Sequence, residues 1–277
     1  MTSDPTEIRF PDFQQYIRFT PAALCIRECI RLEVLSTYPH AAPILDVGCG
    51  DGLFARLAFS TGEVWGIDID ANEGRLAQAS QAYSQVILGD ISRSGFPPSY
   101  FHTCVANCSL EHVPQLDQAL ARIHGALAPG GTLYLFVPTQ DWATRMRAVR
   151  VAQRLGLPWL ADAIVKAIDG IFRHHHLYDL DEWKRRALRA GFEIIEARPI
   201  GSAAAAMHAF ELLLLPSLLG LVVKRLTGRW ILFPRLRASL VVPLYALVRA
   251  LVATSDDTDP SAEWFLVLRR AEEGRVA

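Results

Sequence analysis

The fold is decided by the stretch Ile44-Leu45-Asp46-Val47-Gly48-Cys49-Gly50-Asp51-Gly52. Its apolar first half predicts a buried strand, and its alternate glycines predict a tight turn into a helix that begins near Leu53. Glycine lets the backbone turn sharply and approach a ligand closely, and the N-terminus of the next helix offers unpaired N–H groups to a carboxylate. The stretch therefore predicts a strand-to-helix turn of an α/β fold with a ligand site beside it.

Strand and helix patterns alternate along the chain after this turn. Strands are predicted at 43–47, 64–67, 85–88, 102–107, 132–137, 192–197 and 264–268, and helices at 11–38, 53–59, 72–83, 116–127 and 141–172. One more helix is predicted to begin at the capping box of Asp179 and Glu182 and to end at Gly191. This alternation predicts a parallel sheet with helices on both faces.

Polar residues follow the predicted strands at one edge of this sheet, where open α/β sheets bind their ligands. A carboxylate at Asp68 can accept hydrogen bonds from both hydroxyls of a ribose, and Asp90 is placed for an adenine amino group. Asn107 and Cys108 end the fourth strand. A nicotinamide dehydrogenase is disfavoured, because Leu53 stands where its fingerprint needs a third glycine and because no Tyr-x-x-x-Lys pair is present.

At these residues the sequence resembles the class I S-adenosylmethionine-dependent methyltransferases, of the broad group that includes the ubiquinone and menaquinone biosynthesis methyltransferases. The resemblance covers residues 43–138 and extends more weakly through 174–188 and the last two strands. His102 is a departure, since relatives often carry Asp there. The matching motifs are Asp46 to Gly52, Asp68, Asp90, Ser109-Leu110-Glu111-His112-Val113 and Leu127-Ala128-Pro129-Gly130-Gly131.

The resemblance implies a Rossmann-like, seven-stranded sheet whose last strand inserts antiparallel, and S-adenosylmethionine as the cofactor. It implies cofactor contacts from ten residues: Asp46, Gly48, Cys49 and Gly50 at the methionine end, Asp68 at the ribose, Ile69, Asp90 and Ile91 at the adenine, and Asn107 and Cys108 beneath the sulfonium. The alternative is a non-catalytic module that keeps the fold and the cofactor site.

Methyl transfer from a sulfonium needs alignment of nucleophile and methyl group, and it needs a base only where the nucleophile carries a proton of high pKa. The candidate catalytic residues are His112, at the mouth of the crevice, and His174 and Tyr178, which resemble a His and an aromatic residue near the substrate pocket of relatives. Glu111 and His112 could instead fasten their loop to the sheet. Asp51 could cap the following helix or touch ligand.

No metal ion is expected. The run His174-His175-His176 could in principle hold one, but adjacent residues cannot all face one ion, and no carboxylate or thiolate cluster lies near it in sequence. The five cysteines are odd in number and lack zinc spacing, which favours reduced thiols in the cytoplasm. The N-terminus is neither basic nor apolar and so predicts no secretory signal.

The apolar surplus of the chain lies in one segment. The sequence has 277 residues, 51% of them hydrophobic, with a formal net charge of -1, which argues against nucleic-acid binding. Residues 203–253 hold 35 hydrophobic residues of 51, together with six Lys or Arg and a single acid, Glu211. Without the 35, about 106 of the other 226 residues are hydrophobic, a share typical of globular domains.

This segment is expected to contact a membrane without crossing it. Its longest uncharged runs, 212–223 and 238–248, are too short for a span of about 20 residues. Leu236, Leu240, Leu244, Leu247 and Leu251 would form one apolar helical stripe beside basic residues. The alternative is a lid or dimer face of a soluble methyltransferase.

The sequence thus predicts three regions: an N-terminal helical cap at 1–42, a cofactor-binding domain at 43–200 and 254–277, and a basic, apolar helical insertion at 201–253. The expected partners are a hydrophobic, lipid-like small molecule, such as a quinone precursor, an isoprenoid or a glycolipid, and a membrane surface. The expected location is the cytoplasm, peripheral on the inner face of the cell membrane.

Overall fold

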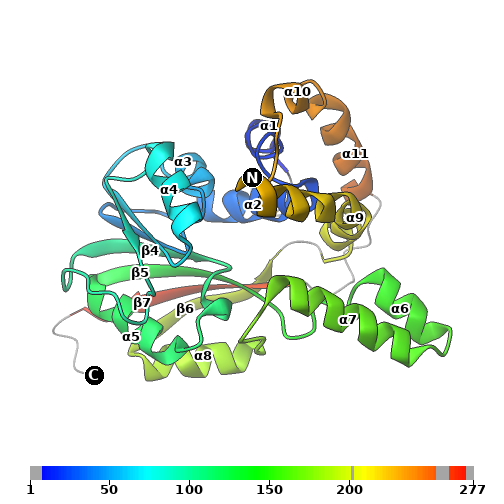
Figure 1. The fold of residues 1–277 in the computed structure, drawn as a ribbon. Coiled ribbons are helices and arrows are strands. Elements are labelled where there is room, and N and C mark those ends of the chain that lie inside the picture. Colours follow the sequence, from blue (N-terminus) through cyan, green and yellow to red (C-terminus); the bar gives the residue numbers. More distant parts are fainter. Residues whose placement is uncertain (1–7, 201–202, 254–261, 273–277) are drawn as a thin grey trace. The chain divides into compact units, whose positions relative to one another are not determined.

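The computed structural model describes residues 8–200, 203–253 and 262–272, so the expected segments at 201–202 and 254–261 and both chain ends lie outside it. The chain divides into two compact units. We call residues 38–141, 169–199 and 263–277 the sheet unit, and residues 1–37, 142–168 and 200–262 the helical unit. Figure 1 shows the elements of both.

The sheet unit contains seven strands, as expected. They are β1 (Ile44–Val47), β2 (Val64–Asp68), β3 (Gln85–Leu88), β4 (Phe101–Asn107), β5 (Leu127–Pro138), β6 (Phe192–Ile200) and β7 (Glu263–Arg270), in the order β3-β2-β1-β4-β5-β7-β6. The pairs among β1 to β5 are parallel, whereas β7 pairs antiparallel with β5, with Leu135 opposite Leu266. The antiparallel insertion of the last strand is confirmed.

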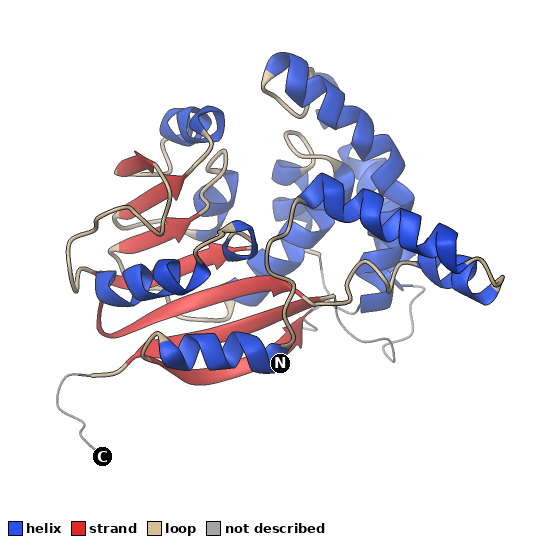
Figure 2. Cartoon of the chain, turned by 60° about the horizontal axis from the view of Figure 1, so that its bottom comes forward, coloured by secondary structure: helices blue, strands red, loops and turns tan. Residues whose placement is uncertain are grey.

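Helices cover both faces of this sheet (Figure 2). They are α3 (Leu53–Ala58), α4 (Ala71–Ser80), the short 3-10 turn η1 (Leu110–His112), α5 (Leu116–Ala126) and α8 (Leu180–Arg189). Leu120 of α5 and Trp183 of α8 pack with Leu45 and other strand residues in one buried core. On β3, the Ile87 side chain packs against that core. The Leu88 side chain points to the other face of the sheet and approaches Gly74 of α4, because successive side chains of a strand alternate between faces.

The helical unit contains the N-terminal helices α1 (Phe10–Tyr16) and α2 (Ala22–Ser36), α6 (Arg147–Arg154) and most of α7 (Pro158–Phe172). The predicted insertion follows as α9 (Ala203–Thr227), α10 (Pro234–Ala238) and α11 (Val241–Ala253). Helix α9 packs against α2 and α11, and α1 packs against α2 and α11.

The division into units differs from the three predicted regions. Residues 142–168, expected in the cofactor domain, belong with the N-terminal helices and the insertion in one unit. Two contacts show why: the guanidinium of Arg27 lies over the Trp142 ring at 5.5 Å, and the Arg147 backbone N–H donates to the Glu211 carboxylate. Hydrophobic pattern alone does not reveal such pairings between distant segments.

The predicted leucine stripe does not form one helix. Helix α10 ends at Ala238, where the Ser239 hydroxyl donates to the Leu236 carbonyl at 2.7 Å, and α11 begins at Val241, so that Pro243 falls in its first turn. Proline is tolerated in a first turn and breaks a helix interior. The side chain of Leu251 lies outside the described residues. Within the described ranges, no helix is long and apolar enough to cross a bilayer.

Candidate functional site

The glycine turn adopts the left-handed backbone that its sequence predicts. Gly48, Gly50 and Gly52 have φ of 77°, 53° and 81°. The backbone N–H groups of Gly48 and Cys49 both donate to the Ile67 carbonyl of the neighbouring strand, at 2.8 and 3.1 Å. A Cβ placed on Gly48 would lie 2.3 Å from the Ser109 Cβ, so only glycine lets the turn approach the segment after β4.

Asp46 is buried below this turn and fixes it through a residue that the sequence analysis missed. The Tyr83 hydroxyl donates to Asp46 Oδ2 at 2.7 Å and also lies 3.3 Å from the Cys49 carbonyl. Burial raises the pKa of the Tyr83 hydroxyl well above its ordinary value, which keeps it a donor. Tyr83 precedes β3, and no motif distinguishes it in the sequence.

Cys49 belongs to the site through its backbone. Its side chain is buried, and a Cβ on Gly66 would lie 2.9 Å from the Cys49 sulfur, so the glycine of β2 makes room for this thiol. Burial raises the pKa of the Cys49 thiol far above its ordinary value, which keeps it protonated. The thiol therefore packs and is no nucleophile.

Asp68 is oriented by two backbone donors. Its Oδ2 accepts the Gly50 N–H and its Oδ1 accepts the Asp70 N–H, both at 2.8 Å. Each carboxylate oxygen has a second lone pair for a further donor. The neighbouring Ile69 side chain is 76% exposed, an apolar surface beside the carboxylate. This combination fits a ribose held at Asp68 and an adenine face at Ile69.

Asp90 lies at the end of β3 and is also held by local hydrogen bonds. Its Oδ1 accepts the backbone N–H and the hydroxyl of Ser92, both at 2.8 Å. Its Oδ2 lies 3.8 Å from Arg93 Nε. The Ile91 side chain is 5% exposed and packs in the sheet core, so the backbone is what Ile91 can offer an adenine.

Asn107 ends β4, and Cys108 follows it beside the glycine turn. Cys108 has φ of 48°, which turns the chain out of the strand, and its N–H donates to the Phe136 carbonyl at 3.0 Å. The Ser109 hydroxyl donates to the Val47 carbonyl at 2.6 Å. The segment after β4 is thereby tied to the glycine turn, and residues from strand ends far apart in sequence meet at one edge of the sheet.

His112 and His174, both predicted as catalytic, meet in a stack of rings. Their ring centroids lie 5.0 Å apart with 18° between the planes, and the Phe172 ring stacks on His174 at 5.7 Å and 2°. His112 Nδ1 lies 3.3 Å from the Arg173 carbonyl, and Nε2 lies 3.8 Å from the buried Glu111 carboxylate. Burial lowers the pKa of His112, so its ring is neutral at pH 7.

The tautomer of His112 follows from these contacts. A carbonyl oxygen only accepts, so a neutral ring that bonds the Arg173 carbonyl carries its proton on Nδ1. Nε2 then holds the lone pair that can take a proton, and the Glu111 carboxylate beside it would stabilise the resulting imidazolium.

Among the described residues, Glu111, His112 and His174 lie close enough together for their side chains to be considered as ligands of one metal ion. Their ligand atoms lie within 4.8 Å of one another. The two imidazole planes are stacked and near-parallel, so the lone pairs of the two rings lie in separate planes. The stack suits ring packing better than coordination of an ion.

Tyr178, the third catalytic candidate, has packing contacts. Its hydroxyl lies 2.8 Å from His176 Nδ1, and His176 Nε2 lies 2.9 Å from the Val113 carbonyl. The carbonyl fixes the proton on Nε2, so Tyr178 donates to Nδ1. The Arg186 guanidinium lies over the Tyr178 ring at 4.6 Å. The structure thus uses Tyr178 and His176 to fasten the segment after α7 to the segment after β4.

Asp51, left open between two roles, lies one residue before Gly52, the N-cap of α3, and satisfies one N–H of that helix. Its Oδ1 accepts the Leu53 backbone N–H at 3.0 Å, at the first residue of α3. Asp179 is the N-cap of α8 as predicted, because its carboxylate accepts the Glu182 N–H at 2.7 Å. The Glu182 carboxylate pairs with Arg185 and Arg186, both at 2.8 Å, so the structure shows the Asp179 half of the predicted capping box.

The chain is similar to known methyltransferases in sequence. Residues 18–197 match the family described as a methyltransferase domain. An uncharacterized methyltransferase of Mycobacterium tuberculosis (strain ATCC 25618 / H37Rv) is 42% identical over 93 residues, 32% of this chain and 47% of that protein, so the match spans about half the length of such relatives. The ubiquinone/menaquinone biosynthesis C-methyltransferase UbiE of Burkholderia mallei (strain SAVP1) is 27% identical over 179 residues, 60% of this chain and 73% of that protein.

Solved structures show the same fold at low sequence identity. An S-adenosylmethionine dependent methyltransferase from Mesorhizobium loti is 17% identical, with a TM-score of 0.53 over 88% of this chain and 97% of that chain. The cyclase SpnF is 16% identical, with a TM-score of 0.56 over 87% of this chain and 80% of that chain. With the family match covering well over half of its length, the chain belongs to the methyltransferase domain family and has the class I fold of the S-adenosylmethionine-dependent methyltransferases.

Proposed function

We propose that this chain transfers a methyl group from S-adenosylmethionine to a hydrophobic, lipid-like small molecule at a membrane surface. The geometry of Asp68 supports the proposed cofactor. Each of its two carboxylate oxygens accepts one backbone N–H beside the glycine turn and keeps a further lone pair for a ribose hydroxyl. The cofactor supplies an already activated methyl group, so alignment and exclusion of water are what the protein must add.

His112 is the proposed general base for a substrate whose nucleophile carries a proton. Its ring is neutral, its Nε2 is the accepting nitrogen, and its segment is tied to the glycine turn through Ser109. Stacking on His174 restricts the rotation of the ring, which gives His174 a positioning role. A substrate that needs no proton removal would use this site for alignment alone.

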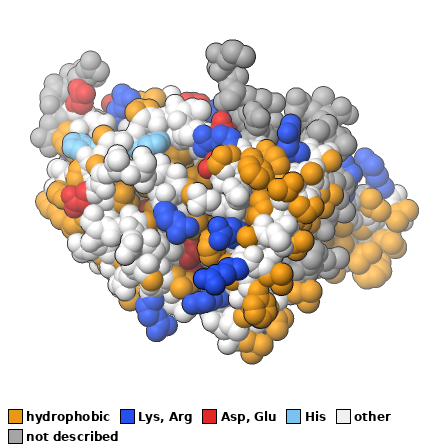
Figure 3. Space-filling model, turned by 90° about the horizontal axis from the view of Figure 1, so that it is seen from above, with side chains coloured by type: hydrophobic (Ala, Val, Ile, Leu, Met, Phe, Trp, Pro, Cys, Tyr) orange, Lys and Arg blue, Asp and Glu red, His pale blue; other side chains and the backbone are white. Residues whose placement is uncertain are grey.

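The surface of the helical unit supports the lipid-like class of substrate. Its exposed apolar side chains include Leu219, Val222, Leu226, Phe233, Leu236 and Leu247. Lys224, Arg225, Arg229, Arg235 and Arg249 lie in the same segment, and no acid occurs in the sequence from 212 to 253. Figure 3 shows hydrophobic and basic side chains on one face of the molecule. Apolar area beside basic residues favours anionic headgroups.

The cofactor claim is tested by thermal melting with S-adenosylhomocysteine. The product should raise the melting temperature of the wild type, and Asp68→Ala should largely abolish that rise. Asp181→Ala is the matched control, because the Asp181 side chain is exposed on α8. An equal rise in Asp68→Ala would contradict the assignment of the ribose site.

The membrane claim is tested by co-sedimentation with vesicles of phosphatidylglycerol and phosphatidylcholine. Val222→Glu with Leu226→Glu should release the protein, because both side chains are more than half exposed in the basic segment. Leu188→Glu, an exposed leucine of the sheet unit, should leave binding unchanged. If the wild type does not sediment with these vesicles, the membrane claim is wrong, and the alternative of a soluble methyltransferase with a lid or dimer face is favoured.

Turnover separates an enzyme from a binding module. Incubation with methyl-labelled cofactor and a membrane lipid extract, followed by mass spectrometry, should yield a labelled hydrophobic product. Cofactor binding with no labelled product from lipid or from soluble extracts would favour the non-catalytic module.

A further inference from the structure

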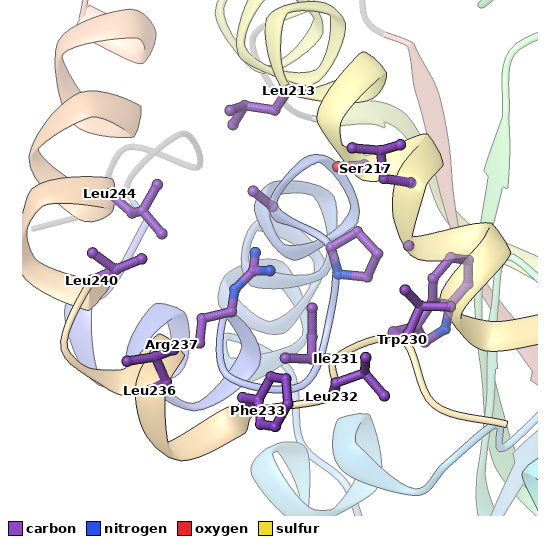
Figure 4. A pocket seen from close by; sticks show the side chains of 15 residues that line it. Leu213, Ser217, Trp230, Ile231, Leu232, Phe233, Leu236, Arg237, Leu240 and Leu244 are labelled. Atoms are coloured by element: carbon purple, nitrogen blue, oxygen red, sulfur yellow. The ribbon is translucent and has the colours of Figure 1, made fainter. Parts of the chain in front are cut away.

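The helical unit contains an apolar cavity of about 560 Å³ that is open to solvent (Figure 4). It lies between the start of α2, α9 from Leu213 onward, and the segment through α10 to α11. Its walls include Leu213 and Gly220 of α9, Trp230 of the following loop, and Leu240 and Leu244. This volume is in the range of about 300–1,000 Å³ that small-molecule sites occupy.

The walls of this cavity offer few polar groups. Ser217 lies on the wall, and its hydroxyl already accepts the Ala23 backbone N–H at 3.4 Å, a contact that joins α9 to α2. The Trp230 ring packs beside Gly220 of α9 and closes one side of the cavity, with 3.4 Å between the ring and a Cβ placed on Gly220. The remaining lining is almost wholly hydrocarbon and suits an alkyl or isoprenoid chain.

Arg237 is the charged residue of the lining. Its side chain extends from α10 toward the space between the helices in Figure 4. Its Nε is buried without a hydrogen-bond partner among the described residues, and burial lowers the pKa of the guanidinium. The acid of this segment, Glu211, accepts the Arg147 N–H instead. A partly desolvated cation without a paired anion is costly, so this site favours an anion.

We propose that this cavity binds one single-chain anionic amphiphile, with its hydrocarbon chain between α9 and α11 and its carboxylate or phosphate head on Arg237. A guanidinium pairs with both head groups through two parallel hydrogen bonds. We infer an anionic head group because the residues that line the cavity include one cation, Arg237, and no acid. The proposal stands apart from methyl transfer, because a chain could occupy the cavity without being the substrate.

The test is equilibrium binding of a fluorescent C18 polyene fatty acid, below its micelle concentration and without vesicles or cofactor. Wild-type protein should bind it saturably, and palmitate and hexadecyl phosphate should displace it. Arg237→Gln should weaken palmitate binding roughly tenfold, as expected for loss of one charged hydrogen-bonding partner. Hexadecanol, which has no charge, should bind both proteins alike.

Two further variants keep this test decisive. Arg235→Gln removes an exposed cation of the same helix, and it should leave the affinity unchanged. Leu240→Trp should fill part of the cavity and lower the affinity for every chain, charged or not. The circular dichroism spectrum and the cofactor-induced rise in melting temperature check that each variant is folded.

Equal loss in Arg235→Gln and Arg237→Gln would overturn the proposal, because it would indicate general surface attraction. Uptake of the fatty acid only from vesicles would also overturn it and would assign the cavity to the membrane-facing surface. So would a lack of saturable binding in the wild type. None of these results depends on whether methyl transfer occurs.

Discussion

At the residue scale, the three glycines of the first turn share a backbone region but differ in surroundings. Gly48 meets Ser109, whereas a Cβ on Gly50 has nothing within 4 Å. Gly50→Ala should cost about 1–2 kcal/mol of unfolding free energy, the usual penalty for a left-handed alanine. Gly48→Ala should cost more and should also weaken S-adenosylhomocysteine binding. Urea unfolding measures the free energies and calorimetry measures the binding. Equal losses of stability in Gly48→Ala and Gly50→Ala would contradict the close approach of Gly48 to Ser109.

The lowered pKa of His112 makes a prediction for the pH profile. Burial is the main cause, and it holds the pKa below the ordinary value of 6.5. For a substrate with an acidic proton, the acid limb of kcat/KM should therefore have its midpoint below pH 6.5, as Nε2 becomes protonated. His112→Gln should lower kcat about 10²- to 10⁴-fold and remove the acid limb. An unchanged acid limb in this variant would assign it to another group.

The same shift affects stability. The unfolded chain binds the His112 proton more readily than the folded chain, so the folded state loses stability as the pH falls below about 6.5. His112→Gln should flatten this part of the stability curve, which urea unfolding across the pH range would show.

Cys108 gives a second test of the cofactor site. It is the partly exposed cysteine, while Cys25, Cys29, Cys49 and Cys104 are buried. Iodoacetamide should therefore modify Cys108 first, and S-adenosylhomocysteine should slow that reaction. Peptide mass spectrometry gives the site and the rate, and modification of Cys108 at the same rate with ligand would place it outside the cofactor site.

At the element scale, the cap of α8 has a measurable value. Asp179→Ala should cost about 0.5–2 kcal/mol of stability, because the Glu182 N–H loses its acceptor at the start of the helix. Asp179→Asn should recover most of the loss, since an amide oxygen caps as well. A chemical-denaturation series gives both values, and a loss that Asn does not restore would indicate another role for the carboxylate.

Helices and strands that are marked by their own periodicity and turn residues could be predicted from the sequence. Boundaries and contacts that depend on residues far away in the chain could not. β3 and the start of α5 lie where period and turn residues predicted them. β5 begins five residues earlier than expected, because Leu127 pairs with Phe101 across the sheet. The cofactor-edge acids follow from strand ends, whereas Tyr83 and the ring stack of Phe172 depend on contacts between segments that a single sequence does not reveal.

At the scale of the whole molecule, a net charge of -1 hides an uneven distribution. Residues 203–253 carry six cations against one anion. Attachment to anionic vesicles should therefore weaken strongly between 0.15 and 1 M salt, as the Debye length falls from about 8 to about 3 Å. Arg225→Gln should weaken it about fivefold, near 1 kcal/mol per cation at a membrane surface. If the protein sediments with the vesicles equally well at both salt concentrations, apolar contact and not charge attracts it to the membrane surface.

The place of β7 between β5 and β6 also bears on how the chain is made. On the ribosome, β1 to β5 can assemble as they emerge, but β6 must wait without a sheet neighbour until all of α9 to α11 has been synthesised. At roughly 5–20 residues per second this wait lasts several seconds. The nascent protein thus exposes an open sheet edge and its most apolar helices at the same time, which makes this interval the one in which a chaperone is most needed.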